Sequence, residues 1–568
     1  MLTKRLTTLA LTMLLPGSLS CLAQDSLLLR DYMYVKQSDP WLTSANAAAL
    51  PRYARQNLSV AELSVTKEKG GLTNYDGSPD VLQADAAIES FFRLSQHTVV
   101  FGSMSYNNFS GKEMGGSAFL PLTSYLSPLT SHLSPLPSPL SPLTSHLSPL
   151  TSKLPHRPFD LVEDSLGNEG RKHSDTYHLA GGFGSTLAGD FAVGARLDYT
   201  AANYAKYKDL RHQNKLMDLQ LSAGFYLPIG SHLKVGANYL YHRNTESLSF
   251  STYGKSDRVY VSLVDYAAFM GHTEQFGSDG YTDKSREMPL VSDCNGVGVQ
   301  ASLQTKPIAA YADFTYAHRR GYYGRKSPYT ITYANHASDI YQAHARLSHQ
   351  SRWSVYHIDL SLDIENLQND AATYRELKNE ASATYYEYYT PVKTANKLWT
   401  SGSAMLTAHL GLRHELPTWT LCAGLNWARR QQTAYVFPYS RRQELNSYEG
   451  VATITRNLPT RQGVWSLSLG GTFQQGSGEP YEDLTLQSPS DKQQAPATME
   501  AYLYREYGYL TAAQYSIAGS IKYAFLLTGT AIRPHVALSL SHRKANETNA
   551  YSLGCDRIYA RLAVGCSF

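Results

Sequence analysis

IYARLAVGCSF, residues 558–568, is the stretch of sequence that decides the fold of this chain. Apolar side chains alternate there with polar or small ones, so an extended strand would be apolar along one whole face. Arg561 belongs to the opposite, polar face. Such a strand, ending on an aromatic residue, is typical of an all-β, transmembrane antiparallel β-barrel. The apolar face comprises Ile558, Ala560, Leu562, Val564, Cys566 and Phe568.

The same strand predicts the location and the partners of the protein. We expect Tyr559, Leu562 and Phe568 to form a barrel-assembly signal. The expected partners are therefore the barrel-assembly machinery and the lipid and lipopolysaccharide of a Gram-negative outer membrane.

The N-terminus favours export. Lys4 and Arg5 precede an apolar run and a Pro-Gly pair, which is the pattern of a signal peptide, expected at residues 1–23 with cleavage after Ala23. Cys21 leaves a lipoprotein as the alternative. The remaining chain has no apolar run of about 18 residues, so any membrane crossing is expected to use strands. The net charge of +4 is too small and dispersed to indicate nucleic-acid binding.

Alternation recurs along most of the chain, and the connections alternate between short and long. This sorting is expected when periplasmic turns are tight and outer loops are long. Eighteen strands with both termini in the periplasm fit best, while 16 or 14 strands remain alternatives. The expected strands are 57–66, 81–92, 97–109, 175–187, 190–204, 214–227, 232–250, 293–304, 308–322, 338–349, 353–366, 397–413, 418–433, 450–458, 463–476, 510–527, 531–545 and 556–568. The expected long loops are 110–174, 251–292, 323–337, 368–396, 434–449 and 477–508.

Two segments lack this alternation. Residues 24–56 are expected to be either a periplasmic lead or a plug inside the barrel, and Asn46-Ala-Ala-Ala-Leu50 is similar to the N-terminal segment of fatty-acid-type transporters. Residues 120–154 fall into seven-residue units such as SPLTSHL, whose prolines exclude a coiled coil. We interpret residues 120–157 as an insertion in an outer loop of the 57–568 barrel. His132 and His146 repeat with the unit and do not predict a metal site.

Charged residues of both signs are expected to face the lumen, which argues against a strongly ion-selective pore. In the loop 251–292, six aromatic residues predict either packing inside the barrel or stacking on a ligand. The expected lumen residues are Arg196, Asp198, Asp218, Asp359, Lys522, Arg533 and Arg561. The loop aromatics are Tyr253, Tyr260, Tyr266, Phe269, Phe276 and Tyr281.

No catalytic, phosphate-binding or metal-binding motif stands in the chain, so we expect no enzyme activity, cofactor or metal. His242, His272 and His318 are interpreted as ordinary solvated histidines. The cysteines remaining after cleavage show no metal spacing, and a Cys294–Cys555 disulfide is an alternative to free thiols. Cys422 and Cys566 are interpreted as small strand residues.

Several segments resemble an uncharacterised outer-membrane β-barrel family of Gram-negative gut and oral bacteria. The clearest are 106–111 (YNNFSG), 158–167 (PFDLVEDSLG), 198–207 (DYTAANYAKY) and 242–250 (HRNTESLSF), together with the aromatic stretch 257–282. The resemblance runs from about residue 57 to residue 568, and relatives lack residues 120–157. It implies the barrel fold and carries over no functional residue.

Three functions remain open from the sequence. The leading hypothesis is a channel or transporter for small molecules, because a barrel of this size has a polar lumen. The alternative is an accessory or scaffold barrel of a surface protein machine, filled by its own loops. An outer-membrane hydrolase comes third.

Overall fold

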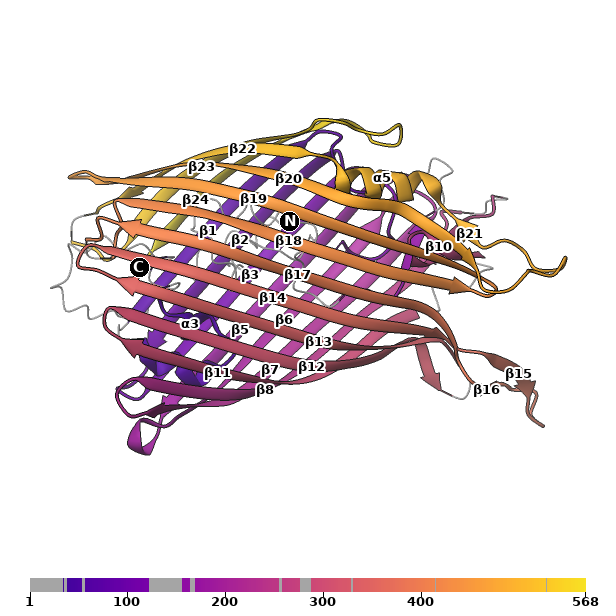
Figure 1. The fold of residues 1–568 in the computed structure, drawn as a ribbon, viewed down its shortest axis with the longest axis horizontal. Helices are drawn as coiled ribbons and strands as arrows, with labels where there is room; N and C mark the ends of the chain where they lie inside the picture. Colours follow the sequence, from indigo (N-terminus) through magenta and orange to yellow (C-terminus); the bar gives the residue numbers. More distant parts are fainter. Residues whose placement is uncertain are drawn as a thin grey trace.

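The computed structural model describes residues 34, 38–53, 57–121, 156–163, 169–254, 258–275, 288–327, 330–413, 415–527 and 529–568. The signal peptide, most of the repeat, Phe276 and Tyr281 lie outside these residues. Within them, eighteen antiparallel strands form a closed barrel (Figure 1). Each wall strand pairs with its neighbours along the chain, and the first pairs with the last, Val60 opposite Ser567, so no edge is left open.

The wall strands run from turn to turn and are 12 to 23 residues long. They are β1 (Asn57–Lys69), β2 (Asp80–Arg93), β3 (Thr98–Met114), β5 (Gly170–Thr186), β6 (Ala192–Lys206), β7 (Arg211–Ile229), β8 (Leu233–Ser251), β11 (Met288–Thr305), β12 (Ile308–Ser327), β13 (Thr330–Gln350), β14 (Ser354–Ala371), β17 (Val392–Leu410), β18 (Trp419–Val436), β19 (Tyr439–Pro459), β20 (Gly463–Thr485), β22 (Gln514–Phe525), β23 (Arg533–Ala545) and β24 (Asp556–Ser567).

Ten further elements of the described residues lie in the connections or before β1. They are the helices α3 (Pro40–Thr43), η1 (Ala47–Arg52), η3 (Ala188–Asp190) and α5 (Glu500–Thr511), and the strands β4 (Asp160–Glu163), β9 (Val261–Ala267), β10 (Met270–Gln275), β15 (Tyr374–Lys378), β16 (Thr384–Tyr388) and β21 (Ala497–Thr498), of which β15 and β16 pair as a separate hairpin. No helix in the described part of the chain is long and apolar enough to cross a membrane.

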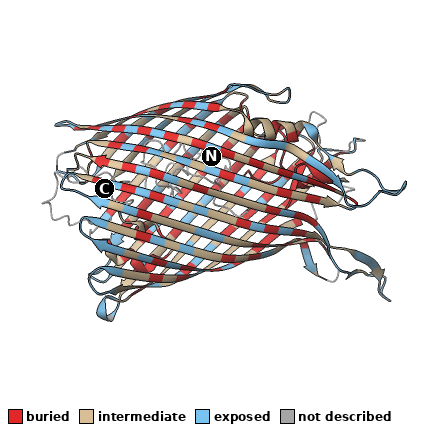
Figure 2. Cartoon of the chain, viewed as in Figure 1, coloured by how far each residue is buried: buried red, intermediate tan, exposed pale blue. Residues whose placement is uncertain are grey.

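Side-chain alternation separates the two faces of the wall, as Figure 2 shows by its alternating burial colours. On β24, Leu562 is 53% exposed on the outside while Ala563 is 2% exposed on the inside. On β18, outward residues are apolar or aromatic from Trp419 to Trp427, and Arg429 follows. Nine residues span about 27 Å along a strand, or roughly 20 Å across the membrane at a tilt of about 40°. This height is slightly below the apolar band of about 25 Å that outer-membrane barrels present to lipid.

The structure corrects two of the expected outer loops. Residues 323–337 and 434–449 are mostly strand. β12 ends only at Ser327 and β13 already begins at Thr330, while β18 ends at Val436 and β19 begins at Tyr439. Beyond the lipid band the outward side chains become polar, so the apolar period disappears although the strands continue. On β18 and β19, for instance, Arg429 and Glu444 form an outward ion pair with 2.6 Å between nitrogen and oxygen. The alternatives of 16 and 14 strands are wrong.

The two ends of the barrel differ. Short turns such as η3, where Gly189 has a φ of 68°, lie at the same end as Phe568 and α3. At the opposite end lie α5, β10, β21 and the β15–β16 hairpin (Figure 1). We call these the turn end and the loop end.

Candidate functional site

A short segment closes the turn end from inside. Asp39 caps α3 by accepting a hydrogen bond from the Trp41 amide at 3.1 Å, and Pro40 is suited to the first helical position. Asn46 caps η1 in the same way through the Ala48 amide at 3.1 Å. Trp41 is 2% exposed, and Ala48 is fully buried. Residues 38–53 are called the inner plug below.

Glycines of the wall form the seat of the inner plug. Gly184, Gly194 and Gly224 lie directly opposite one another on β5, β6 and β7 and face the lumen. A Cβ atom on Gly194 would lie 2.5 Å from the Ala48 nitrogen, and one on Gly224 would lie 2.6 Å from the Asn46 side chain. Since such approaches are too close for carbon, only glycine lets the plug backbone lie on this wall.

A few polar contacts hold the inner plug in place. The Trp41 indole donates to Ser302 at 3.0 Å, and the Asn46 amide donates to Gln300 at 3.0 Å. Arg52 pairs with Asp39 within the plug at 2.8 Å and donates to Tyr226 of β7 at 3.0 Å, and Arg93 of β2 donates to the Pro51 carbonyl at 3.0 Å. Among the described residues the plug continues into the wall through β1, and these contacts and its apolar packing define how firmly it sits.

Three connections fold inward and close the loop end. Strands β21, β10, β9 and β4 form a four-stranded sheet inside the barrel mouth, and α5 packs beside it. Tyr260, Tyr266 and Phe269 are buried here, which agrees with the alternative of packing inside the barrel, whereas Tyr253 is 77% exposed and does not pack there. We call the sheet and α5 the outer closure.

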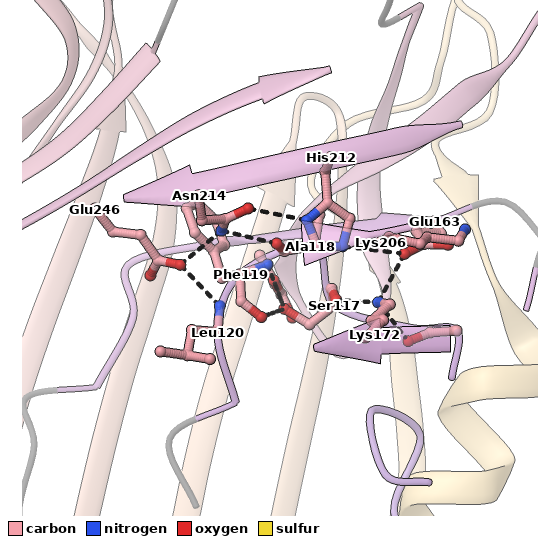
Figure 3. A network of polar contacts seen from close by, with 12 residues as sticks. Ser117, Ala118, Phe119, Leu120, Glu163, Lys172, Lys206, His212, Asn214 and Glu246 are labelled. Atoms are coloured by element: carbon pink, nitrogen blue, oxygen red, sulfur yellow. Dashed lines mark hydrogen bonds and ion pairs between the residues drawn. The ribbon is translucent and has the colours of Figure 1, made fainter. Parts of the chain in front are cut away.

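Buried charges bind the outer closure to the wall (Figure 3). Glu163 of β4 lies 2.7 Å from the Lys172 ammonium and also pairs with Lys206. Both lysine side chains are fully buried. Glu246 of β8 accepts from the Leu120 amide at 2.8 Å and from Asn214 at 2.7 Å. Breaking a buried pair by removing one partner is strongly destabilising, so these contacts fix the loops in place.

The helix α5 adds a second group of charges. Glu506 accepts two hydrogen bonds from the Arg430 guanidinium, at 3.0 and 2.6 Å. Arg505 donates to Thr73 in the connection between β1 and β2 at 2.7 Å. Asp76 of that connection is partly buried, and burial together with the carboxylates of Asp160 and Glu506 raises its pKa to about 6.

A cavity of about 150 Å³ lies between the two closures. The order along β11 shows this: Ser302 contacts the inner plug, Cys294 lines the cavity, and Leu290 packs in the outer hydrophobic cluster. On β12, Tyr311, Thr315 and Tyr323 repeat that order. We call this space the chamber. Its polar and aromatic lining includes His156, His242, Gln342, Asp363, Glu365 and Trp399.

His156 enters the chamber from the segment that precedes β4. Its ring stacks on Trp399, with centroids 4.0 Å apart and planes 6° from parallel. Its Nδ1 and its backbone nitrogen lie 2.8 and 2.9 Å from Oε2 of Glu365. The sequence did not single out these residues, although alternation in the expected strands 353–366 and 397–413 directs Glu365 and Trp399 inward.

The predicted lumen residues face inward, and most have partners on the wall. The pairs are Arg196 with Asp198 at 2.6 Å, Asp218 with His242 at 2.7 Å, Asp359 with Arg346 at 2.6 Å, and Arg561 with Glu62 at 2.6 Å. Lys522 and Arg533 occupy inward positions of β22 and β23. His242 is therefore a hydrogen-bonded lining residue of the chamber, and its interpretation as a solvated histidine is wrong.

The remaining candidate residues are spread over the barrel. Cys294 and Cys422 are buried free thiols on inner positions and Cys555 is an exposed one, so the Cys294–Cys555 disulfide does not form. Tyr559 faces inward, while Leu562 and Phe568 face outward. Their role as an assembly signal stays a prediction.

The lipid-facing wall and the closed sheet identify the chain as an outer-membrane β-barrel. Similar solved structures include the outer membrane transporter YddB from Escherichia coli (8% identity, 90% of this chain and 81% of that chain, TM-score 0.36). A second is the alcaligin outer membrane receptor FauA from Bordetella pertussis (8% identity, 90% of this chain and 76% of that chain, TM-score 0.38). A third is the ferripyoverdine receptor of Pseudomonas aeruginosa (10% identity, 91% of this chain and 72% of that chain, TM-score 0.35). TM-scores this low carry no argument about ligands.

No curated protein sequence matches the chain. A family of unknown function, DUF6850, matches residues 164–568. This range contains the resembling segments 198–207, 242–250 and 257–282, and it confirms the resemblance to an uncharacterised barrel family. The match spans most of the sequence, and the chain belongs to the DUF6850 family.

Proposed function

We propose that this protein is a gated outer-membrane channel or transporter for small molecules. The observation that carries the proposal is the chamber, a cavity with polar, aromatic and aliphatic lining residues that is bracketed by two closures that the chain itself supplies. A barrel serving as a solid scaffold has no need for a lined cavity at this depth. The polar lining and the wall of paired charges suit small polar solutes.

The inner plug is the gate in this proposal. In the described part of the chain it continues into the wall through β1, and it rests on glycines and a few hydrogen bonds. The outer closure consists of connections held at both ends by wall strands. Displacement of the plug therefore requires less rearrangement than displacement of the outer closure.

The orientation follows from the lengths of the connections. Outer-membrane barrels place short turns in the periplasm and long loops outside. The turn end carries Phe568 and the inner plug, which supports a periplasmic location for both termini. A solute in the chamber then leaves into the periplasm past the plug.

A scaffold barrel of a surface machine is the second candidate, favoured because described residues fill both mouths. In that case the closures are permanent, and a protein partner should co-purify with this chain from outer membranes in a stoichiometric amount. The proposal assigns no catalytic step to this chain.

Planar-bilayer recording separates the two candidates. The full chain is expected to be closed with rare openings. A variant lacking residues 38–53 should conduct little while the outer closure stays in place, and one lacking residues 258–275 as well should conduct steadily. Correct folding is checked by heat-modifiable migration of the detergent-solubilised barrel. A folded double deletion without any conductance would exclude the channel.

A further inference from the structure

The chamber contains a site that the chain itself occupies. Glu365 on β14 and Trp399 on β17 lie directly opposite each other in the sheet, and both side chains face the lumen. A carboxylate and an indole face are thereby presented side by side to the chamber. His156 covers both at once, as a stacked ring on Trp399 and as a hydrogen-bond donor to Glu365.

The two oxygens of Glu365 serve different partners. Oε1 accepts from the wall residues Arg319, at 2.7 Å, and Ser338, at 2.9 Å. Oε2 accepts from His156 at 2.8 Å, and because a carboxylate only accepts, Nδ1 of His156 carries the proton. The wall thus fixes the carboxylate, and its second oxygen points to the position held by His156.

The wall part of this site and its occupant come from different segments. Glu365, Trp399, Arg319 and Ser338 stand on four neighbouring strands, whereas His156 belongs to the inward segment before β4. The His156 backbone is also bound to the wall, since its N–H donates to Glu365 and its carbonyl accepts from Arg319, both at 2.9 Å. If His156 leaves, the ring face of Trp399 and Oε2 of Glu365 remain in position next to the chamber. Such preorganised groups bind a replacement at low conformational cost.

We propose that Trp399 and Glu365 form a binding site for a small planar molecule with an N–H donor, of the imidazole or guanidinium type, and that His156 occupies it as an internal ligand. This inference rests on the proposed uptake function and names the class of solute. A planar molecule can stack on the indole ring of Trp399, and its N–H group can donate a hydrogen bond to Oε2 of Glu365. Asp363 and Glu365 are the carboxylates of the described lining, which favours a cation over an anion.

The competition between His156 and a free ligand has a measurable consequence. An occupant on the same chain acts at an effective concentration on the order of millimolar or above. In the full chain, a free ligand must displace His156, so its apparent affinity is lowered. Removal of the imidazole by His156→Ala should therefore raise the affinity for added imidazole by about tenfold or more.

The test measures imidazole binding to folded, detergent-solubilised protein by saturation-transfer NMR. The gain in H156A should disappear in H156A/W399L and in H156A/E365Q, and methylguanidinium should behave like imidazole. The matched control H349A removes an outward histidine whose ring lies 6.2 Å from Tyr356, and it should bind as the wild type does. Because W399L keeps the ion pair of Glu365 with Arg319, it covers the case in which E365Q does not fold.

Two results would overturn the inference. One is that H156A binds imidazole no better than the wild type, or keeps its gain in both double variants. The other is that glucose, a neutral molecule that also stacks on indoles, binds H156A more tightly than imidazole does. These measurements need no conductance, so they fail or succeed separately from the bilayer test of gating.

Discussion

The inner plug and the outer closure fill the same barrel by different means. The plug lies on backbone, over Gly184, Gly194 and Gly224. Its ion pair, Arg52 with Asp39, is internal, and across the contact with the wall the guanidinium groups of Arg52 and Arg93 donate to uncharged partners. The outer closure is tied by buried ion pairs such as that between Glu163 and Lys172. Close packing on glycine holds a segment without an electrostatic penalty for leaving, whereas separation of a buried pair exposes uncompensated charge. The comparison indicates a movable gate at the turn end and a fixed closure at the loop end.

The largest effect is expected from Glu163→Gln. The substitution leaves Lys172 and Lys206 buried without their shared carboxylate, which should destabilise the outer closure locally by about 3–5 kcal/mol. Hydrogen exchange of β9 and β10 should accelerate strongly, while residues 41–50 keep their protection. As a control, Glu444→Gln alters an outward pair and should leave both regions unchanged. Equal acceleration at both ends would contradict separate closures.

Gly194→Val should displace the inner plug. The new Cβ meets the Ala48 nitrogen, and overpacking of this kind costs about 1–3 kcal/mol. Tryptic cleavage after Arg52 should then accelerate about ten- to a hundredfold. Gly102→Val is the matched control, since a Cβ there meets nothing within 4 Å. An unchanged cleavage rate in G194V would contradict the claim that the plug packs on Gly194.

A smaller effect is expected from pH at the outer closure. The pKa of Asp76 is raised to about 6 in the folded protein, so its protonated form is favoured there. The closure should be most stable below the unfolded pKa and should weaken as pH rises toward and through 6, by on the order of 1 kcal/mol because Asp76 is partly exposed. Hydrogen exchange of α5 between pH 4 and 8 measures this. Asp76→Asn should flatten the profile, and a wild-type profile already flat would refute the assignment.

The smallest effect is expected from Arg375→Ala. Arg375 and Glu387 pair at 2.7 Å in the β15–β16 hairpin, where both side chains are largely exposed. Exposed pairs contribute little, so neither closure should change in hydrogen exchange. A loss of protection in β9 would show that the outer closure extends to this hairpin.

The sequence predicts the wall because each strand repeats a local period. The faces of Leu562 and Arg561 followed from alternation within β24, and so did the inward position of Cys422. The outer ends of β12, β13, β18 and β19 could not be predicted in this way, because the period disappears where the wall leaves lipid. Strand pairing maintains those ends instead.

The closures and the chamber depend on contacts between distant residues. Gly184, Gly194 and Gly224 form a seat only because the strand register aligns them, which no local pattern encodes. The sequence signal that could have indicated this seat is the recurrence of glycine at inward positions near successive turns. Likewise, Glu365 and Trp399 could be assigned to the lumen individually, but their direct pairing requires the register of β14 with β17.

The central claim is that the inner plug opens while the outer closure stays in place. Hydrogen exchange of the wild-type barrel in detergent tests it most directly by comparing the amides of residues 47–50 with those of β9. Faster exchange in 47–50, by about tenfold or more, is the result that a lightly seated gate predicts. Equal protection, or faster exchange in β9, would contradict the account.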